Sequence, residues 1–278
     1  MKKLIALLIP ISLLFFNAVA QQIKTPPPSP PQYVKQDFGL SSIELSYSRP
    51  GVKGRTIFGD LVPFGKVWRT GANSATTLTF GDDVTIGGTK IAAGKYGLLT
   101  IPGEKEWTII VTKQLDVTNP AAYKQDQDVV RITTQIQTLP FSIENFTIVF
   151  DNITNSSCNL ILFWDKTAVA LPIQTDVDSR IMKQIDETMN NDNKPYFNAA
   201  MYYLDNGKDL NKALGWFNKA IDQQPDGFFI YYQKARCLAK LGKKDDAIAT
   251  AKKGIESAKM AKNDDYVALN EKLIASLK

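Results

Sequence analysis

The chain has 278 residues, of which 44 % are hydrophobic and 22 % are charged, a length and composition typical of a globular protein with two domains. The formal net charge of +5 is a small surplus spread over the whole chain, so we expect no nucleic-acid partner. The chain contains no histidine, which excludes Ser-His-Asp and Cys-His catalysis and histidine-ligated metal sites. Paired-carboxylate, Ser-Lys and oxygen-ligated calcium chemistry stay open, but we find no convincing motif for them and predict no catalytic residue, cofactor or metal.

The first twenty residues are typical of a secretory signal peptide. A basic start, MKK, is followed by the short apolar run LIALLIPISLLFF and by AVA, which places small residues where a signal peptidase reads the chain. We therefore predict cleavage between Ala20 and Gln21 and a periplasmic or extracellular protein. The alternative is a membrane anchor, but the run is shorter than the roughly 20 apolar residues that a spanning helix needs. No later segment is apolar enough to span a membrane, so we predict no membrane span.

Residues 21–37 are rich in proline. The stretch TPPPSPP contains five prolines, which remove backbone donors and fix φ, so it is not expected to form a helix or a central strand. We predict an extended, semi-rigid linker over residues 21–37.

Residues 38–175 have the pattern of a succession of short strands. In SIELSYS the apolar Ile43, Leu45 and Tyr47 alternate with polar residues, which is the period of a half-buried strand. Similar runs follow at short intervals, from TTLTF to AVALPI, with glycine, asparagine, aspartate and proline between them. This pattern predicts an all-β antiparallel sandwich or barrel.

One segment of this β domain is too irregular to be a strand. YSRPGVKGRTIFGDLVPFGKVWRTGANSAT, residues 47–76, contains five cationic side chains, one acidic side chain and several glycines. A loop of this length inside a compact domain is usually functional or disordered. Its aromatic residues Phe58, Phe64 and Trp68 favour an ordered loop that is anchored on the sheets.

Two interpretations of this cationic loop are open. In the first, arginine side chains and glycine N–H groups bind a carboxylate or phosphate of a ligand. In the second, the arginines pair with the domain's own acids, such as Glu44, Asp82 and Asp83, or with loop carbonyls. The candidate ligand-binding residues are Arg49, Lys53, Arg55, Lys66, Trp68, Arg69 and Asn73.

The stretch from YSRPGVKGR to GKYGLLTIP resembles the signature region of an uncharacterised bacterial family, domain of unknown function 2911. The resemblance covers about residues 38–173 and includes LFWDKTAVALPI near its end. Members of that family are typically exported, and some carry a tetratricopeptide tail. The resemblance implies a shared site on the cationic loop, but it implies no activity, ligand or cofactor.

Residues 176–278 change to a helical period and contain a repeat. NKALGWFNKAIDQQP, residues 211–225, superimposes on DDAIATAKKGIESAK, residues 245–259, with matched core positions 34 residues apart. This spacing resembles the tetratricopeptide repeat. We predict an α-helical domain with two such repeats, at about 194–227 and 228–261, and with capping helices before and after them.

In tetratricopeptide arrays the first helix of each repeat lines the concave face, and the resemblance makes that face the candidate partner-binding surface. We expect a protein or peptide partner there, bound weakly because two repeats form only a short groove. The candidate partner-binding residues are Phe197, Met201, Phe229, Tyr232 and Arg236.

Cys158 and Cys237 fall in different predicted domains, and two buried thiols or an inter-domain disulfide are both compatible with export. Together the patterns predict an exported, non-catalytic binding or interaction protein of the bacterial cell envelope. Its β domain would bind an anionic small molecule or glycan, and its helical tail would dock a protein. The alternatives are a structural or assembly factor of the envelope and a hydrolase that acts on an anionic polymer.

Overall fold

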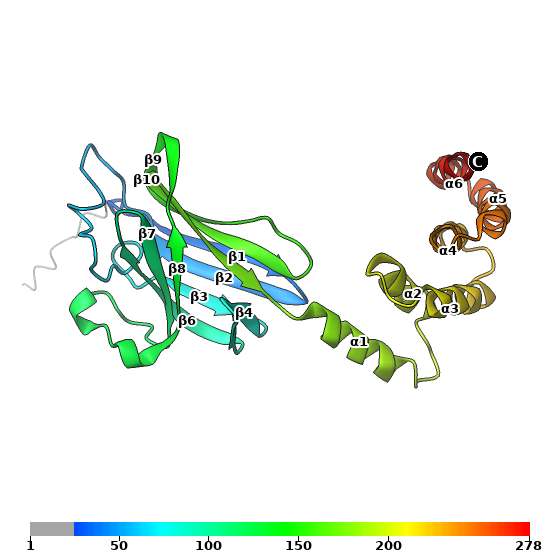
Figure 1. Cartoon of the computed structure of the whole chain (residues 1–278), viewed down its shortest axis with the longest axis horizontal. Coiled ribbons are helices and arrows are strands. Elements are labelled where there is room, and N and C mark those ends of the chain that lie inside the picture. Colours follow the sequence, from blue (N-terminus) through cyan, green and yellow to red (C-terminus); the bar gives the residue numbers. More distant parts are fainter. Residues whose placement is uncertain (1–24) are drawn as a thin grey trace, which may run out of the picture. The chain divides into compact units, whose positions relative to one another are not determined.

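The computed structural model describes residues 25–278 (Figure 1). The expected signal peptide and its cleavage site lie outside the described residues. The chain divides into two compact units, the first ending at Thr175 and the second beginning at Asp176. The predicted order, an antiparallel β domain followed by a helical domain, is confirmed.

The first unit is a sandwich of two sheets, whose neighbouring strands run antiparallel (Figure 1). One sheet has six strands in the order β1-β2-β3-β6-β7-β8, and the other has four strands in the order β5-β4-β10-β9. The strands are β1 (Pro31–Phe38), β2 (Ser41–Ser48), β3 (Thr77–Phe80), β4 (Val84–Ile86), β5 (Thr89–Ile91), β6 (Gly94–Pro102), β7 (Glu106–Thr112), β8 (Asp128–Gln135), β9 (Gln137–Asp151) and β10 (Ser157–Gln174).

Alternation along each strand decides which side chains enter the core between the sheets. On β2, Ile43, Leu45 and Tyr47 are all buried, as their period predicts. Tyr47 reaches the opposite sheet, where its ring packs edge-on against Phe146 at 5.8 Å and its hydroxyl accepts from Ile148 N at 2.9 Å. Burial of one large apolar side chain contributes about 1.5–3 kcal/mol, so this shared core holds the two sheets together.

The start of the sandwich corrects one prediction. Residues 31–37, expected to be the end of a proline-rich linker, form most of β1, which pairs with β2 from Pro31 opposite Ser48 to Phe38 opposite Ser41. Proline is tolerated at the first residue of an edge strand, where its missing N–H costs little. Exposure alternates along QYVKQDF, but Gln32 and Gln36 occupy two of the less exposed positions, so the residues themselves do not show the period of a strand.

The second unit consists of helices, which form two hairpins, α2 with α3 and α4 with α5, between a first and a last helix (Figure 1). A glycine with a left-handed backbone ends the first helix of each hairpin, Gly207 with φ 64° and Gly242 with φ 75°. The helices are α1 (Val177–Thr188), α2 (Tyr196–Asp205), α3 (Leu210–Gln223), α4 (Phe228–Lys240), α5 (Lys244–Met260) and α6 (Asp264–Leu277).

Small residues allow these helices to pack closely. Ala213 of α3 and Ala247 of α5 occupy equivalent repeat positions, and both are fully buried. Gly254 of α5 is required by the approach of α6, because a Cβ at this position would lie 2.9 Å from Oδ1 of Asn270. The matched small residues of the repeat are therefore the contact points of the helices.

Candidate functional site

The cationic loop, defined here as residues 49–76, leaves the first sheet after β2 and pairs at once with the second sheet. Val52 N donates to Glu144 O at 2.7 Å, and Phe146 N donates to Pro50 O at 2.8 Å. These bonds form a short antiparallel bridge between the loop and β9. The beginning of the loop is therefore fixed by backbone hydrogen bonds.

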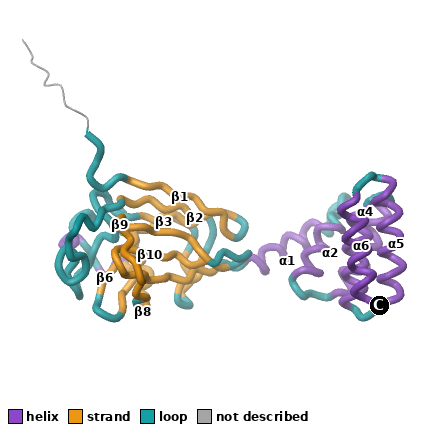
Figure 2. The backbone as a smooth tube through the Cα atoms, turned by 90° about the horizontal axis from the view of Figure 1, so that it is seen from above, coloured by secondary structure: helices purple, strands orange, loops and turns teal. Residues whose placement is uncertain are grey.

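The end of the cationic loop returns to the first sheet. Trp68 and Thr100 of β6 exchange two backbone hydrogen bonds, of 2.7 and 3.0 Å. Gly65 N also donates to Pro102 O at 2.8 Å. The loop is thus bonded to both sheets, and Figure 2 shows that the loops of the strand unit gather mainly at one end of it.

Trp68 anchors the loop on the core. Its side chain is 8 % exposed and stacks on Trp164 of β10, with ring centroids 5.5 Å apart and planes inclined by 17°. Its Nε1 donates to Gly71 O at 3.1 Å, which satisfies a buried donor. Phe58 packs edge-on against Trp68 at 6.2 Å, as expected of an anchor. Phe64, the third expected anchor, is instead 38 % exposed.

Backbone strain is concentrated in the same loop. Lys53, Thr70 and Asn73 have left-handed φ angles of 49°, 55° and 58°. Thr70 is the costliest of the three, because it is β-branched and fully buried. Its hydroxyl donates to Oγ1 of Thr100 at 3.0 Å, and its carbonyl accepts from Oγ1 of Thr76 at 2.6 Å. A residue strained in this way costs on the order of 1–3 kcal/mol, and such residues cluster at functional sites.

A pocket of about 340 Å³ lies beside Trp68. The cationic loop supplies most of its wall, and Trp164 of β10, Pro120 and Ser29 supply much of the rest. Leu61, on the loop, is 44 % exposed and adds an apolar surface. The volume and the mixture of apolar and polar lining are those of a small-molecule site.

Three of the seven predicted ligand-binding residues do not line this pocket. Arg49 is bonded to β9, where Nε donates to Phe146 O at 3.0 Å and Nη2 donates to Oγ1 of Thr147 at 2.6 Å. Nδ2 of Asn73 donates at 3.0 Å to a backbone carbonyl of the segment before β1. Lys53 is exposed on a turn. Arg49 and Asn73 therefore serve to position the loop.

The pocket brings the other four predicted residues together, and its two arginines are bonded to backbone carbonyls. Nε and Nη2 of Arg55 donate to Val52 O at 3.1 Å and to Gly51 O at 2.6 Å. Nη1 of Arg69 donates to Thr118 O. The four residues are Arg55, Lys66, Trp68 and Arg69.

Two of the acids that we considered as partners of these cations, Glu44 and Asp83, pair with lysines outside the pocket. Glu44 pairs with Lys35 and Asp83 pairs with Lys90, each at 3.2 Å. Across residues 25–278, no ion pair that we identify includes a cationic side chain of the pocket. Each arginine is thus bonded within the fold, and no carboxylate of the described residues forms an ion pair with it.

Trp164 contributes to the pocket although it was not predicted as a site residue. This residue is 2 % exposed and lines the pocket, and its Nε1 has no hydrogen-bond partner in the described part of the chain. An unsatisfied buried donor costs about 1–3 kcal/mol. The alternation in LFWDK places Trp164 in the core, but no local pattern shows that it meets the cationic loop, because the contact joins segments far apart in the chain.

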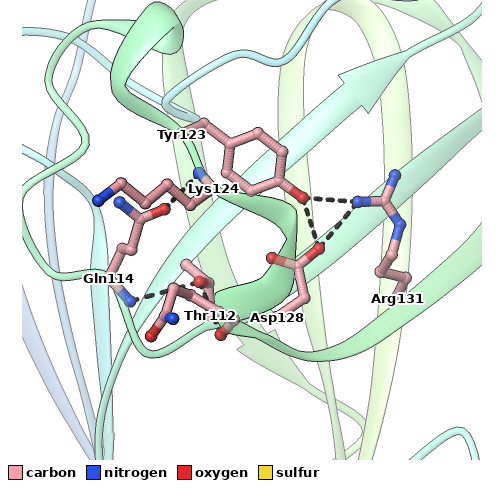
Figure 3. A network of polar contacts seen from close by, with 7 residues as sticks. Thr112, Gln114, Tyr123, Lys124, Asp128 and Arg131 are labelled. Atoms are coloured by element: carbon pink, nitrogen blue, oxygen red, sulfur yellow. Dashed lines mark hydrogen bonds and ion pairs between the residues drawn. The ribbon is translucent and has the colours of Figure 1, made fainter.

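A second loop, residues 113–127, carries the carbonyl that accepts from Arg69, and a polar network fixes this loop to β8 (Figure 3). Tyr123 Oη donates to Oδ2 of Asp128 at 2.5 Å, and Nη1 of Arg131 donates to the same oxygen at 2.8 Å. Burial, reinforced by the bond to Asp128, raises the pKa of Tyr123 to about 12. The network holds one wall of the pocket in place.

The apolar residues predicted to bind a partner are engaged within the helical unit. Phe197 of α2 and Phe229 of α4 pack edge-on at 5.0 Å. Met201 is half-buried against the same core. These side chains therefore contribute first to the packing of the two hairpins.

The polar residues predicted for the same surface also have partners. Arg236 of α4 pairs with Asp205 at 3.3 Å and donates to Oε1 of Gln233 at 2.6 Å. Tyr232 packs edge-on against Tyr266 of α6, with centroids 5.8 Å apart. Both side chains are half-buried, so this surface offers little that the fold does not already use.

The two cysteines are both buried free thiols, which is the first of the two alternatives considered. Cys158 lies on β10 and Cys237 lies on α4. Burial raises the pKa of Cys158 to about 11 and also raises that of Cys237. Both thiols are protonated at neutral pH and therefore weakly nucleophilic.

An antiparallel β-sandwich with a loop-lined pocket, followed by helical hairpins at tetratricopeptide spacing, defines the class of this two-domain protein. The chain belongs to the family described as Protein of unknown function (DUF2911), whose model matches residues 29–173. The family prediction is confirmed, and the match begins earlier than the expected residue 38. It includes β1, most of which lies in the segment predicted to be a linker.

A tetratricopeptide repeat model matches residues 216–249, from within α3 to the start of α5, so the predicted repeat class is confirmed. A crystal structure of a tetratricopeptide repeat domain protein from Salinibacter ruber also matches, with 23 % identity, a TM-score of 0.28 and coverage of 30 % of this chain and 91 % of that chain. No curated protein matches the chain.

Tetratricopeptide repeats suggest a role in protein interaction for the helical unit. Between residues 25 and 278, no helix combines the length and the apolar character needed to cross a bilayer.

Proposed function

We propose that this protein is an exported, non-catalytic binding protein of the bacterial cell envelope, whose β-sandwich binds an anionic ligand and whose helical repeats dock a protein partner. One observation carries the proposal: Arg55, Lys66 and Arg69 line one pocket, and none of them belongs to an ion pair that we identify among the described residues. A carboxylate or phosphate in the pocket would meet positive charge that the fold leaves uncompensated.

The two arginines keep hydrogen-bond donors for such a ligand. A guanidinium group has five N–H donors. The carbonyl bonds of Arg55 use Nε and Nη2, and that of Arg69 uses Nη1. These bonds fix the direction of each side chain, and the remaining N–H groups can form charge-assisted bonds, which are roughly twice as strong as neutral ones. Lys66 is exposed and adds a mobile point charge.

The apolar lining favours an organic anion over a free inorganic ion. Trp68 and Trp164 form the aromatic part of the pocket wall, and Leu61 adds an exposed aliphatic surface. Pockets for organic ligands combine such apolar lining with a few polar groups that set orientation. A sugar phosphate or a uronic acid, free or at the end of a glycan, has both features.

The exported location is supported by the pattern of the first twenty residues. The test is to express the full sequence in a bacterial host and to determine the N-terminus of the protein in the periplasmic fraction. We expect the mature chain to begin at Gln21. Protein that stays in the cytoplasm with its start intact contradicts this part of the proposal.

Ligand binding is tested by thermal unfolding of the purified protein with glucose 6-phosphate, glucuronate or inorganic phosphate, and with neutral glucose as the ligand control. We expect at least one organic anion to raise the Tm of the β unit and glucose to leave it unchanged. A ligand at about 100 times its Kd stabilises the folded state by about 2.7 kcal/mol, which is a readily measured shift.

Matched variants locate the effect. Lys66→Gln with Arg69→Gln removes two positive charges from the pocket, and we expect it to abolish the stabilisation. Lys95→Gln with Lys105→Gln removes the same charge from exposed positions that do not line this pocket, and the stabilisation should persist. The same loss in both variants, or no stabilisation by any of the anions, contradicts the anion site.

A further inference from the structure

A second recess lies in the helical unit, between α3, α4 and α5. It has a volume of about 390 Å³, and we call it the lysine groove. Leu214 and Ile221 of α3 and Leu238 of α4 give it an apolar lining. Of these, Leu238 is 4 % exposed and the other two are half-buried. An apolar side chain of a partner protein that bound in this recess would be buried from water, and no core residue would have to move.

Three lysines also line the lysine groove: Lys234, Lys243 and Lys253. In the described part of the chain, none of them belongs to an ion pair that we identify. The acids near them are Asp246, which lines the groove, and Asp222, which acts on Lys234 from α3. The cations outnumber the acids, so the groove carries an excess of positive charge.

Lys234 lies at a position where its positive charge is unfavourable. Burial and, after it, repulsion by Lys253 lower the pKa of Lys234, while Asp246 and Asp222 offset part of the effect. A carboxylate placed between Lys234 and Lys253 would replace this repulsion with attraction to both. The fold itself supplies no such carboxylate within ion-pair distance among residues 25–278.

We propose that the lysine groove docks an acidic peptide segment of a partner protein, with one apolar side chain against Leu214, Ile221 and Leu238 and flanking carboxylates on the lysines. The proposal rests on the proposed docking function of the repeats and moves it from the surface around Tyr232 and Arg236 to this groove. Charge complementarity selects an acidic partner. The apolar lining selects a peptide side chain over a small inorganic anion.

Direct binding tests the proposal. The full chain is titrated into a short fluorescent peptide in which glutamates flank one leucine, and the anisotropy of the label is measured. Two control peptides replace the glutamates with glutamine or the leucine with glycine. We expect the first peptide to bind, each control peptide to bind at least about tenfold more weakly, and binding to weaken as salt is raised.

Variants of the chain then place the peptide. Lys234→Gln with Lys253→Gln should weaken binding at least about tenfold. Lys259→Gln with Lys272→Gln, which changes two exposed lysines that do not line the groove, should leave binding unchanged. Thermal unfolding of both variants checks the fold, and loss of repulsion in the groove should leave the first variant at least as stable as the parent chain.

The failures are distinguishable. If the peptide binds the groove variant and the parent chain equally, and Arg236→Gln abolishes binding, docking persists on the other surface and the lysine groove is not the site. If all three peptides bind alike, the proposed partner class is wrong. If inorganic phosphate displaces the labelled peptide as well as the same peptide without its label does, the groove is a general anion site and the proposed partner class is also wrong. If no peptide binds the parent chain, the acidic-segment proposal is overturned.

Discussion

The two pockets use cationic side chains in opposite ways. In the β-sandwich, Arg55 and Arg69 are bonded to backbone carbonyls, so they belong to the fold before any ligand arrives. In the lysine groove, Lys234 and Lys253 line a recess without an identified ion pair in the described chain. A planar guanidinium suits a fixed direction, whereas an ammonium on a flexible stem suits adjustment. We infer that the first pocket is preorganised by its loop, while the second binds through an apolar lining and lysine side chains that adjust to the ligand.

Among the tests of this comparison, Trp68→Ala has the largest expected effect. Removing the ring that stacks on Trp164 leaves a cavity beside the loop, and we expect this to lower the free energy of unfolding by about 4 kcal/mol. We expect the unfolding transition of the β unit to move to lower temperature while that of the helical unit stays in place. Differential scanning calorimetry of the full chain resolves the two transitions.

Phe64→Ala is the matched control, because it removes an aromatic ring from the same loop at a residue that is 38 % exposed. We expect it to cost less than about 1 kcal/mol. If both substitutions have the same small effect, the loop is not anchored by its buried ring, and the contrast between a preorganised pocket and an adjustable groove disappears.

Two glycines test how tightly the helices behind the lysine groove are packed. Gly254→Ala would place a methyl group 2.9 Å from Oδ1 of Asn270, which is fully buried, and we expect overpacking to cost about 1–3 kcal/mol. Gly215→Ala, on α3, meets no atom within 4 Å and should stabilise its helix by about 0.5–1 kcal/mol. Denaturant unfolding of the helical unit measures both, and effects of the same sign would contradict the tight crossing of α5 and α6.

The sandwich and the repeats could be predicted because their signals are local. Alternation of Ile43, Leu45 and Tyr47 places β2, and the repeat places Ala213 and Ala247 at equivalent buried positions. Strand β1 was missed because its pairing with β2, not its own composition, overrides the proline signal. An element was predicted correctly where its local sequence preference agrees with its pairing in the fold, and it was missed where the two disagree.

The pocket was predictable only in part for the same reason. The charge and length of the cationic loop singled out Arg55, Lys66 and Arg69, which do line one pocket. Nothing local distinguished them from Arg49, whose partners lie on β9, far along the chain. Trp164 was invisible as a pocket residue because its role arises from the contact between β10 and the loop.

A smaller effect is expected at the polar network beside the β pocket. Tyr123→Phe removes the hydrogen bond to Asp128 and should cost about 0.5–1.5 kcal/mol at neutral pH. Because folding raises the pKa of Tyr123 from its ordinary value of 10.0 to about 12, its bond contributes fully below pH 10 and is lost as the pH rises from 10 towards 12. The variant should therefore show less alkaline destabilisation of the β unit than the parent chain.

Tyr202 provides the matched site in the helical unit. Its hydroxyl donates to Asp178 at 2.7 Å, and burial together with that bond also raises its pKa to about 12. Tyr202→Phe should reduce the alkaline sensitivity of the helical transition only. Calorimetry between pH 8 and pH 12 separates the two, and an identical pH profile for the parent chain and both variants would refute the role of these bonds.

The smallest expected effect is at Lys53, where strain and charge can be separated. Arg55 N donates to Val52 O at 3.0 Å, and the two central residues of this turn, Lys53 and Gly54, both have left-handed φ angles, of 49° and 70°. Asparagine adopts this backbone more readily than lysine and is favoured before glycine in such turns. Lys53→Asn should therefore stabilise the β unit by up to about 1 kcal/mol.

The same substitution also removes a positive charge from the loop. Because Lys53 lies outside the pocket, the stabilisation by an organic anion should be unchanged in Lys53→Asn, in contrast to Lys66→Gln with Arg69→Gln. Chemical unfolding and the ligand-induced shift in Tm are measured on one preparation. A variant that is more stable but binds less would mean that the loop attracts its ligand through its overall charge, so that the arginine contacts of the pocket would not define the site.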